Sequence, residues 1–284
     1  MIRILVPYDF SPSADHALDF AISLTHNYPK LEILVLHVIE TPMTTGVGAM
    51  GGGFDPIPDF ENQVFFMELL ENRKKQFEEL RQKFAQSEFE LSTKIEVGNI
   101  YRNISDTIIN QSIDLTVMGS KGSSGLDEIL IGSNTEKVVR TATCPVITVK
   151  EKTDASQLKK VVFASDFRQA DHEVAGRFKK MQHLFDAEFY FVFVNTPGSF
   201  ETSRESMNRI RTFVNTHKFE HVKAEIYNSL SEEEGIIQFA EDIDADMIAI
   251  TTHGRSGLLH LFTGSIAEDV VNHSKRPVWT FKVK

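Results

Sequence analysis

Short apolar runs rich in β-branched residues alternate with amphipathic stretches along the first half of the chain. The runs predict buried strands at residues 2–6, 31–38, 91–97, 115–118 and 146–149. Strands that are apolar at nearly every position are typical of a parallel sheet covered on both faces. The amphipathic stretches predict helices at residues 12–22, 63–86, 104–111 and 133–141. Because strands and helices alternate, the pattern predicts an α/β fold with helices on both faces of a parallel sheet.

The same order of patterns begins again in the second half, where residues 160–167 mirror the N-terminal strand and turn. Asp9 and Asp166 lie 157 positions apart, whereas Gly132 and Gly264 lie 132 positions apart, so the first half carries 25 additional residues in its middle. We interpret this as an internal duplication of one β/α unit. A short polar segment without periodicity separates the copies and predicts two domains, 1–150 and 158–284, joined by a linker at 151–157.

A glycine-rich stretch follows the fourth predicted strand and opens the helix after it. Gly119, Gly122 and Gly132 stand where the backbone must turn tightly or come close to a bulky group. A helix start offers unpaired N–H groups and a partial positive charge, which suit a phosphate, and the hydroxyls of Ser133 and Thr135 add donors there. The spacing matches neither a Walker loop nor the dinucleotide-binding glycine turn. The stretch therefore predicts a cradle for nucleotide phosphates.

The spacing G-x2-G-x9-G-S resembles that of the ATP-binding universal stress proteins. The flanking residues agree, with VMGS at 117–120 before the glycines and CPVITV at 144–149 after them. The resemblance covers both halves and implies two tandem Rossmann-like domains, each with a five-stranded parallel sheet. It also implies that the cofactor is ATP or a related adenine nucleotide, AMP or ADP, with or without Mg²⁺.

The resemblance also bears on how the halves assemble. Residues 146–149 and 278–281 are the final strands of the two halves, and an apolar strand at a sheet edge needs something to pair with it. In the resembled family this edge joins single-domain chains into dimers. The resemblance therefore implies an internal pseudo-dimer of the two halves with Trp279 buried near the contact, and it leaves a homodimer of two chains open.

Ligands of open parallel sheets lie beyond the carboxyl ends of the strands. Asp9 would accept hydrogen bonds from ribose or adenine, and the alternative is a carboxylate that caps the next helix. Val38 and Met118 would pack against adenine or serve as core, and Lys121 would pair with a phosphate or stay solvated. The first-half candidates are Pro7, Tyr8, Asp9, Val38, Met118, Gly119, Lys121, Gly122, Gly132, Ser133, Asn134 and Thr135.

The second half keeps part of this pattern. Its candidates are Asp166, Val194, Gly254, Gly264 and Ser265. Thr251 replaces the first glycine of the motif, and Ile266 and Ala267 replace two polar residues that follow the last one. A Cβ atom at Thr251 would crowd the phosphates. The sequence leaves nucleotide binding by the second half open.

Composition and charge limit the kinds of binding partner and the compartment that we expect for this protein. A net charge of −10 argues against nucleic acid, and no apolar run approaches the length of a membrane span. One cysteine excludes an internal disulfide, and the N-terminal apolar run is too short for a signal peptide, so we expect a cytoplasmic protein. Residues 41–60, rich in glycine, predict a long loop at the ligand end of the sheet, which we hypothesise to be a lid.

Three functions fit these patterns. The first is a binding module that holds an adenine nucleotide and responds to the energy or stress state of the cell. The second is a slow ATPase or autophosphorylating enzyme, although no general base is recognisable. The third is an interaction scaffold with decayed sites. His217 and His221 stand four residues apart, but a helix end between them argues against a metal site, so no catalytic or metal residue is assigned.

Overall fold

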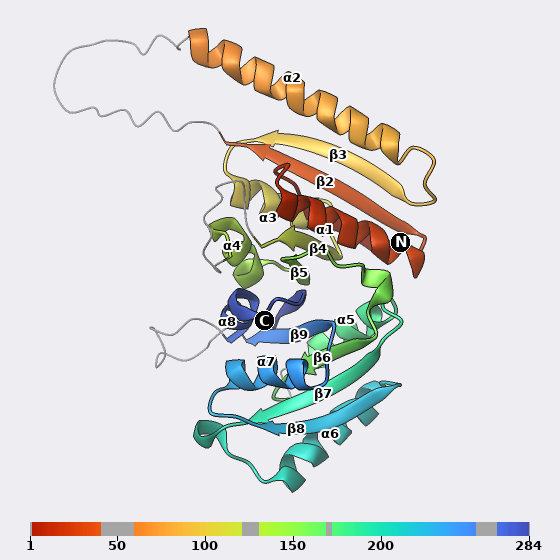
Figure 1. Ribbon diagram of the computed structural model, residues 1–284, viewed down its shortest axis with the longest axis vertical. Coiled ribbons are helices and arrows are strands. Elements are labelled where there is room, and N and C mark those ends of the chain that lie inside the picture. Colours follow the sequence, from red (N-terminus) through yellow and green to blue (C-terminus); the bar gives the residue numbers. More distant parts are fainter. Residues whose placement is uncertain (1, 41–59, 121–130, 169–171, 254–265, 284) are drawn as a thin grey trace, which may run out of the picture.

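The computed structural model describes residues 2–40, 60–120, 131–168, 172–253 and 266–283 (Figure 1). The first half contains β1 (Ile2–Pro7), α1 (Pro12–Ser23), η1 (Leu24–His26), β2 (Leu31–Ile39), α2 (Phe60–Lys83), β3 (Glu90–Val97), α3 (Ile100–Asn110), β4 (Leu115–Gly119), α4 (Ser133–Thr141) and β5 (Val146–Val149). The second half contains β6 (Lys160–Ala164), α5 (His172–Gln182), β7 (Glu188–Asn195), η4 (Pro197–Ser199), α6 (Ser203–His217), β8 (Val222–Asn228), α7 (Glu232–Asp242), β9 (Met247–His253), α8 (Ile266–His273) and β10 (Val278–Val283). The predicted alternation of strands and helices is thus confirmed.

The described strands form one ten-stranded sheet in the order β3-β2-β1-β4-β5-β10-β9-β6-β7-β8. Pairing within each half is parallel throughout, whereas β5 and β10 pair antiparallel, with Trp279 opposite Ile147. The final strands of the halves therefore join edge to edge, as predicted, and Trp279 is 2% exposed. The indole ring lies 4.8 Å from the ring of Phe178, centroid to centroid.

Helices cover both faces of the sheet (Figure 1). One face is covered by α1, α2, α5 and α6, which contribute the buried side chains Phe20, Phe77, Phe178 and Phe213. The other is covered by α3, α4, α7 and α8, which contribute Ile104, Val138, Phe239 and Val270. Burying apolar faces of helices on both sides of a sheet is the main stabilisation available to such a fold. In the described part of the chain, no helix is long and apolar enough to cross a membrane.

Capping residues set where the helices begin. Ser11 accepts a hydrogen bond from the Ala14 N–H (3.2 Å), and Pro12 occupies the first turn of α1. The prediction that α3 begins at residue 104 was wrong, because Asn99 caps the helix by accepting from the Arg102 N–H (3.0 Å). The apolar pattern had marked the buried part of this helix and missed its exposed first turn.

The predicted linker is anchored to the first half. It contains the short helix η2 (Ala155–Gln157), and Ala155 is buried. The Ala155 N–H donates to the Ser23 hydroxyl oxygen at the end of α1 (2.8 Å). The Asp154 carboxylate accepts from the Ser156 N–H (2.9 Å) and caps η2. The segment therefore packs against the first half and is not a linker without contacts.

Candidate functional site

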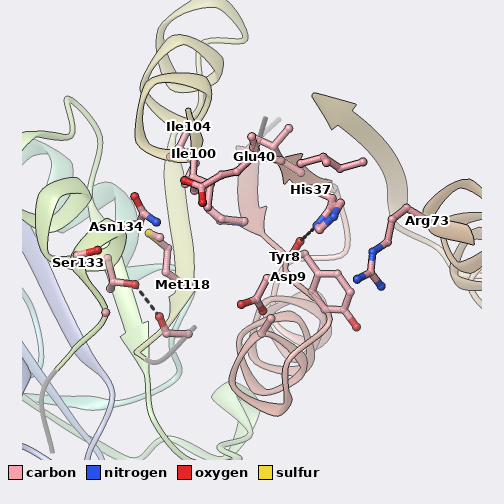
Figure 2. A pocket seen from close by; sticks show the side chains of 18 of the residues that line it. Tyr8, Asp9, His37, Glu40, Arg73, Ile100, Ile104, Met118, Ser133 and Asn134 are labelled. Carbon is pink, nitrogen blue, oxygen red and sulfur yellow. Dashed lines mark hydrogen bonds between the residues drawn. The ribbon is translucent and has the colours of Figure 1, made fainter. Parts of the chain in front are cut away.

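A cavity of about 490 Å³ lies at the carboxyl ends of β1, β2 and β4 and at the start of α4 (Figure 2). The predicted first-half residues that line it are Pro7, Tyr8, Asp9, Val38, Met118, Gly119, Gly132, Ser133, Asn134 and Thr135. Lys121 and Gly122 lie outside the described residues, as do residues 41–59 of the predicted lid. The structure therefore brings together every first-half candidate that it describes.

The start of α4 forms one end of the cavity. Gly132 is its N-cap residue, with no side chain to cap the helix. The Gly132 N–H donates to the carbonyl of Ser120 (2.7 Å), and the Thr135 hydroxyl donates to the carbonyl of Gly119 (3.0 Å). The first N–H groups of a helix have no intrahelical partner and carry a partial positive charge. With Ser133 beside it, this end can accept an anionic group.

Gly119 has a structural reason to be glycine. A Cβ atom there would lie 2.5 Å from the Ser13 hydroxyl oxygen and 2.6 Å from the Ser13 carbonyl oxygen. Those distances are too short for any side chain, because the backbone of α1 cannot withdraw cheaply. The close approach predicted for this glycine therefore occurs against the first turn of α1.

Asp9 lies just before α1 and faces the cavity (Figure 2). Its carboxylate accepts a hydrogen bond from the N–H of Ser11 (3.0 Å), two residues on. Ser11 itself caps the helix, so the alternative role considered for Asp9, as the cap, is wrong. The carboxylate instead orders the turn that leads from β1 into α1.

His37 lines the cavity although the sequence analysis did not select it. Its Nδ1 atom lies 2.7 Å from the Tyr8 carbonyl oxygen, so Nδ1 carries the proton and donates. Burial lowers the pKa of His37; the hydrogen bond to the Tyr8 carbonyl offsets part of this effect and nearby Arg73 adds to it, so the neutral ring is favoured. The Tyr8 hydroxyl donates to Asp15, and burial, followed by that hydrogen bond, raises the pKa of Tyr8 well above its usual range.

Arg73 reaches the cavity from α2, at the end opposite α4 (Figure 2). Its guanidinium carbon lies 4.4 Å from the ring centre of Phe10, and its Nη1 donates to the Gln76 side chain (2.8 Å). Its Nε is buried and has no hydrogen-bond partner. Among the described residues, no carboxylate forms a salt bridge with Arg73. This end of the cavity thus carries a guanidinium group that no described carboxylate pairs with directly, although Glu40 lines the same cavity.

Apolar side chains form the remaining wall. Ile100 and Ile104 of α3 and Leu69 of α2 line the cavity beside Val38 and Met118. Cavities that combine apolar walls with a few polar groups are typical of small-molecule sites, and their volumes commonly run from about 300 to 1,000 Å³. The first-half cavity has that character and that size.

The equivalent cavity of the second half is smaller, at about 170 Å³. Asp166, Val194 and Thr251 line it, whereas Gly254, Gly264 and Ser265 lie outside the described residues. Glu232, the first residue of α7, stands where α3 places Ile100, so a carboxylate replaces an apolar wall. The smaller volume disfavours a nucleotide. Each cavity is lined by two carboxylates, Asp9 and Glu40 in the first half and Asp166 and Glu232 in the second, so the halves differ in where this charge lies rather than in its amount.

Packing explains part of the difference in volume. A Cβ atom at Gly235 of α7 would lie 2.5 Å from Cγ1 of Val194, so this glycine lets α7 approach β7 closely. The Asp166 carboxylate accepts from the Arg168 N–H (3.0 Å), and the Arg168 guanidinium lies 3.3 Å from a carboxylate oxygen of Glu201. Asp166 thus accepts from the N–H two residues on, as Asp9 does in the first half.

Other candidate chemistry finds no support among the described residues. No group of three or more His, Cys, Asp or Glu side chains there is arranged to hold a metal ion. His217 ends α6 and His221 precedes β8 with a positive φ of 56°, so the two are not on one helical face. Cys144 is buried against the Thr116 hydroxyl (3.3 Å), and burial raises the pKa of its thiol to about 11. Such a thiol is unreactive.

Comparison with known protein families matches both halves of the chain to the same family. The profile of the universal stress protein family matches residues 1–150 and again residues 157–282. A universal stress protein of Methanocaldococcus jannaschii is 30% identical over 159 residues, which cover 53% of this chain and 95% of that protein. One of Bacillus subtilis is 30% identical over 153 residues, covering 52% and 98%.

Among solved structures, a universal stress protein from Archaeoglobus fulgidus superposes with a TM-score of 0.75 and 21% identity, over 99% of this chain and 98% of that one. At 21% identity, this superposition supports the fold of the chain, including its arrangement as two successive domains. The family profile, which matches twice and covers nearly the whole chain, supports the assignment. The chain belongs to the universal stress protein family and carries two of its domains in tandem.

Proposed function

We propose that the first half binds an adenine nucleotide, ATP or its relatives ADP and AMP, and that the protein thereby responds to the energy or stress state of the cell. The observation that carries this proposal is that a cavity of ligand size continues directly into an uncapped helix start. The phosphates would lie at Gly132 and Ser133, where N–H groups and a hydroxyl can donate to them.

The rest of the cavity suits the nucleoside. Val38, Met118, Ile100 and Ile104 offer apolar surface for the base, whose faces gain most from leaving water. Asp9 offers an acceptor for ribose hydroxyls or for an amino group. Mg²⁺, where it takes part, would be held mainly by phosphate oxygens, as is usual for nucleotide sites.

We expect a single nucleotide site in the chain. The second-half cavity falls below the usual size of a ligand site and presents Glu232 to its contents. Glu232 stands where Ile100 offers apolar surface in the first half, and placing a carboxylate against the base costs binding free energy. Titration calorimetry should therefore give a stoichiometry of one nucleotide per chain.

The test begins with Gly132→Val. A β-branched side chain at the N-cap position would stand where the phosphates approach the backbone, so we expect affinity for ATP to fall by at least about tenfold, or 1.4 kcal/mol. The matched control is Gly198→Val, because a Cβ atom at Gly198 meets nothing within 4 Å. Calorimetry on both folded variants decides between the outcomes. Wild-type affinity in Gly132→Val would refute the cradle.

Small molecules extracted from the purified protein should include an adenine nucleotide, identified by mass spectrometry. Retained ATP supports a binding module. Release of phosphate from added ATP, with ADP or AMP retained, would instead favour slow hydrolysis. A protein that retains no nucleotide and shows no heat with ATP, ADP or AMP would overturn the proposal.

A further inference from the structure

The two halves meet at the entry to α4. The side-chain oxygen of Asn272, in the last turn of α8, accepts a hydrogen bond from the Ile131 N–H (3.1 Å). Ile131 immediately precedes Gly132, the N-cap residue of α4. Figure 1 shows α8 of the second half beside α4 of the first. A residue of the second half therefore bonds to the backbone that forms the phosphate end of the first-half cavity.

Asn272 is itself held in place by the first half. The Nζ atom of Lys150, the residue that directly follows β5, donates a hydrogen bond to the backbone carbonyl of Asn272. Carbonyls in the last turn of a helix lack intrahelical partners and carry a partial negative charge, so a lysine there is favourable. The backbone of Asn272 is thus anchored on one side, and its side chain is directed to Ile131 on the other.

The contact affects how the turn into α4 is placed. The Gly132 N–H donates to the Ser120 carbonyl at the end of β4 (2.7 Å), and the preceding N–H, of Ile131, donates to Asn272. Two consecutive N–H groups are therefore held by acceptors from different halves. Ser133 and Asn134 follow at once and line the cavity. A shift of the turn would move these groups away from an anion.

We propose that Asn272 is a positioning residue for the phosphate end of the first-half site, so that the site depends on the second half. This inference rests on the proposed nucleotide function. It assigns the second half a role that does not require a ligand in its own smaller cavity. The expected signature is selective, because the Asn272 contact acts on the α4 entry and not on the apolar walls around the base.

The test compares Asn272→Leu with the wild type. Leucine keeps the approximate volume and removes the acceptor for Ile131. We expect affinity for ATP to fall by about fivefold, the usual effect of losing one such hydrogen bond, while affinity for adenosine stays unchanged. Asn208→Leu is the control, since Asn208 is exposed on α6 and lines neither cavity.

Amide hydrogen exchange supplies a readout that needs no ligand. The Ile131 N–H should exchange faster in Asn272→Leu than in the wild type, and Asn272→Asp, which keeps an acceptor, should restore its protection. Asn208→Leu should leave the exchange of Ile131 unchanged. Equal exchange at Ile131 in all four proteins would refute the positioning role.

The outcomes separate the two proposals. Equal losses of ATP and adenosine affinity in Asn272→Leu would indicate a general structural effect and would overturn this inference. Wild-type affinities in that variant would overturn it too, while the proposed function would stand. A wild-type protein that binds no adenine nucleotide would refute the proposed function, and the exchange experiment would still decide whether Asn272 holds the turn.

Discussion

At the scale of single residues, His37 distinguishes the first-half cavity from the second, where Phe193 occupies the equivalent place before the strand-end valine. The imidazole is buried, which lowers its pKa and favours the neutral ring, and its Nδ1 donates to the Tyr8 carbonyl. A polar ring in a run of apolar strand residues is a sign that the strand end faces something other than core. In this case it faces the proposed ligand cavity.

We predict that His37 makes stability depend on pH. Folding lowers the pKa of His37. When the pH falls below the ordinary histidine value of about 6.5, the unfolded state therefore takes up a proton that the folded state does not. The free energy of unfolding therefore falls with acidification, by at most about 1.4 kcal/mol per pH unit from this group. His37→Phe should flatten that dependence relative to the wild type, as measured by urea unfolding at several pH values between 7.5 and 5.

The exposed histidine His183 provides the control, as His183→Gln. We expect its unfolding free energy to change with pH in parallel with the wild type. Parallel curves for His37→Phe and the wild type would instead show that His37 does not carry the effect.

At the scale of elements, α2 and α6 carry the same Arg-x3-Phe spacing, Arg73–Phe77 and Arg209–Phe213. Both phenylalanines are buried in one core, and both guanidinium groups stack on an aromatic ring, that of Phe10 before α1 for Arg73 and that of Phe193 in β7 for Arg209. Arg209 also pairs with Glu201, with Nη2 2.7 Å from a carboxylate oxygen. Arg73 faces the larger cavity instead. The duplicated helix thus supplies a structural ion pair in one half and a cavity cation in the other.

This difference predicts opposite phenotypes. Arg209→Met should lower the free energy of unfolding by about 1–3 kcal/mol, because it leaves Glu201 without its main partner, and should leave ATP affinity unchanged. Arg73→Met should change stability by less than about 1 kcal/mol, since it leaves no described carboxylate without a partner, and should weaken ATP binding. Urea unfolding and calorimetry on both variants measure the two effects. Equal ATP affinity in Arg73→Met and wild type would exclude a ligand role for Arg73.

At the scale of the whole molecule, the β5–β10 pair makes one sheet of two domains. Side chains reinforce the pair, because the hydroxyls of Thr148 and Thr280 donate to the carbonyls of Val278 and Val146 across it (3.2 and 3.3 Å). Such contacts shield two apolar strand edges that would otherwise favour association with other chains. The junction also brings Asn272 to the turn before α4.

We predict that the halves stay associated when the linker is cut. A protease site placed at the exposed residues Glu151 and Lys152 lies ahead of the packed helix η2, so cleavage there should leave the β5–β10 junction intact. Analytical ultracentrifugation at micromolar concentration should still report the mass of the intact chain, 32.1 kDa, or a multiple of it. Two stable half-size monomers would contradict the prediction.

Whereas the pairing of the final strands was implied by the family resemblance, the sequence by itself determined the order of strands and helices, the duplication and the first-half candidates around Asp9 and Gly132. These follow from local causes: hydrophobic periodicity, turn chemistry and the rule that ligands lie at the carboxyl ends of parallel strands. The Arg-x3-Phe repeat was also visible in the sequence, although its spacing says nothing about which arginine is paired.

The tertiary structure alone decided which distant side chains share the cavity. Arg73 enters it because Phe77 packs α2 against the rings of Phe10 and His37. Glu232 changes the second cavity because Gly235 lets α7 approach β7. Asn272 reaches Ile131, 141 positions earlier, across a junction between domains. Such contacts depend on how whole elements pack and on small differences in their separation, and no local pattern of residues encodes them.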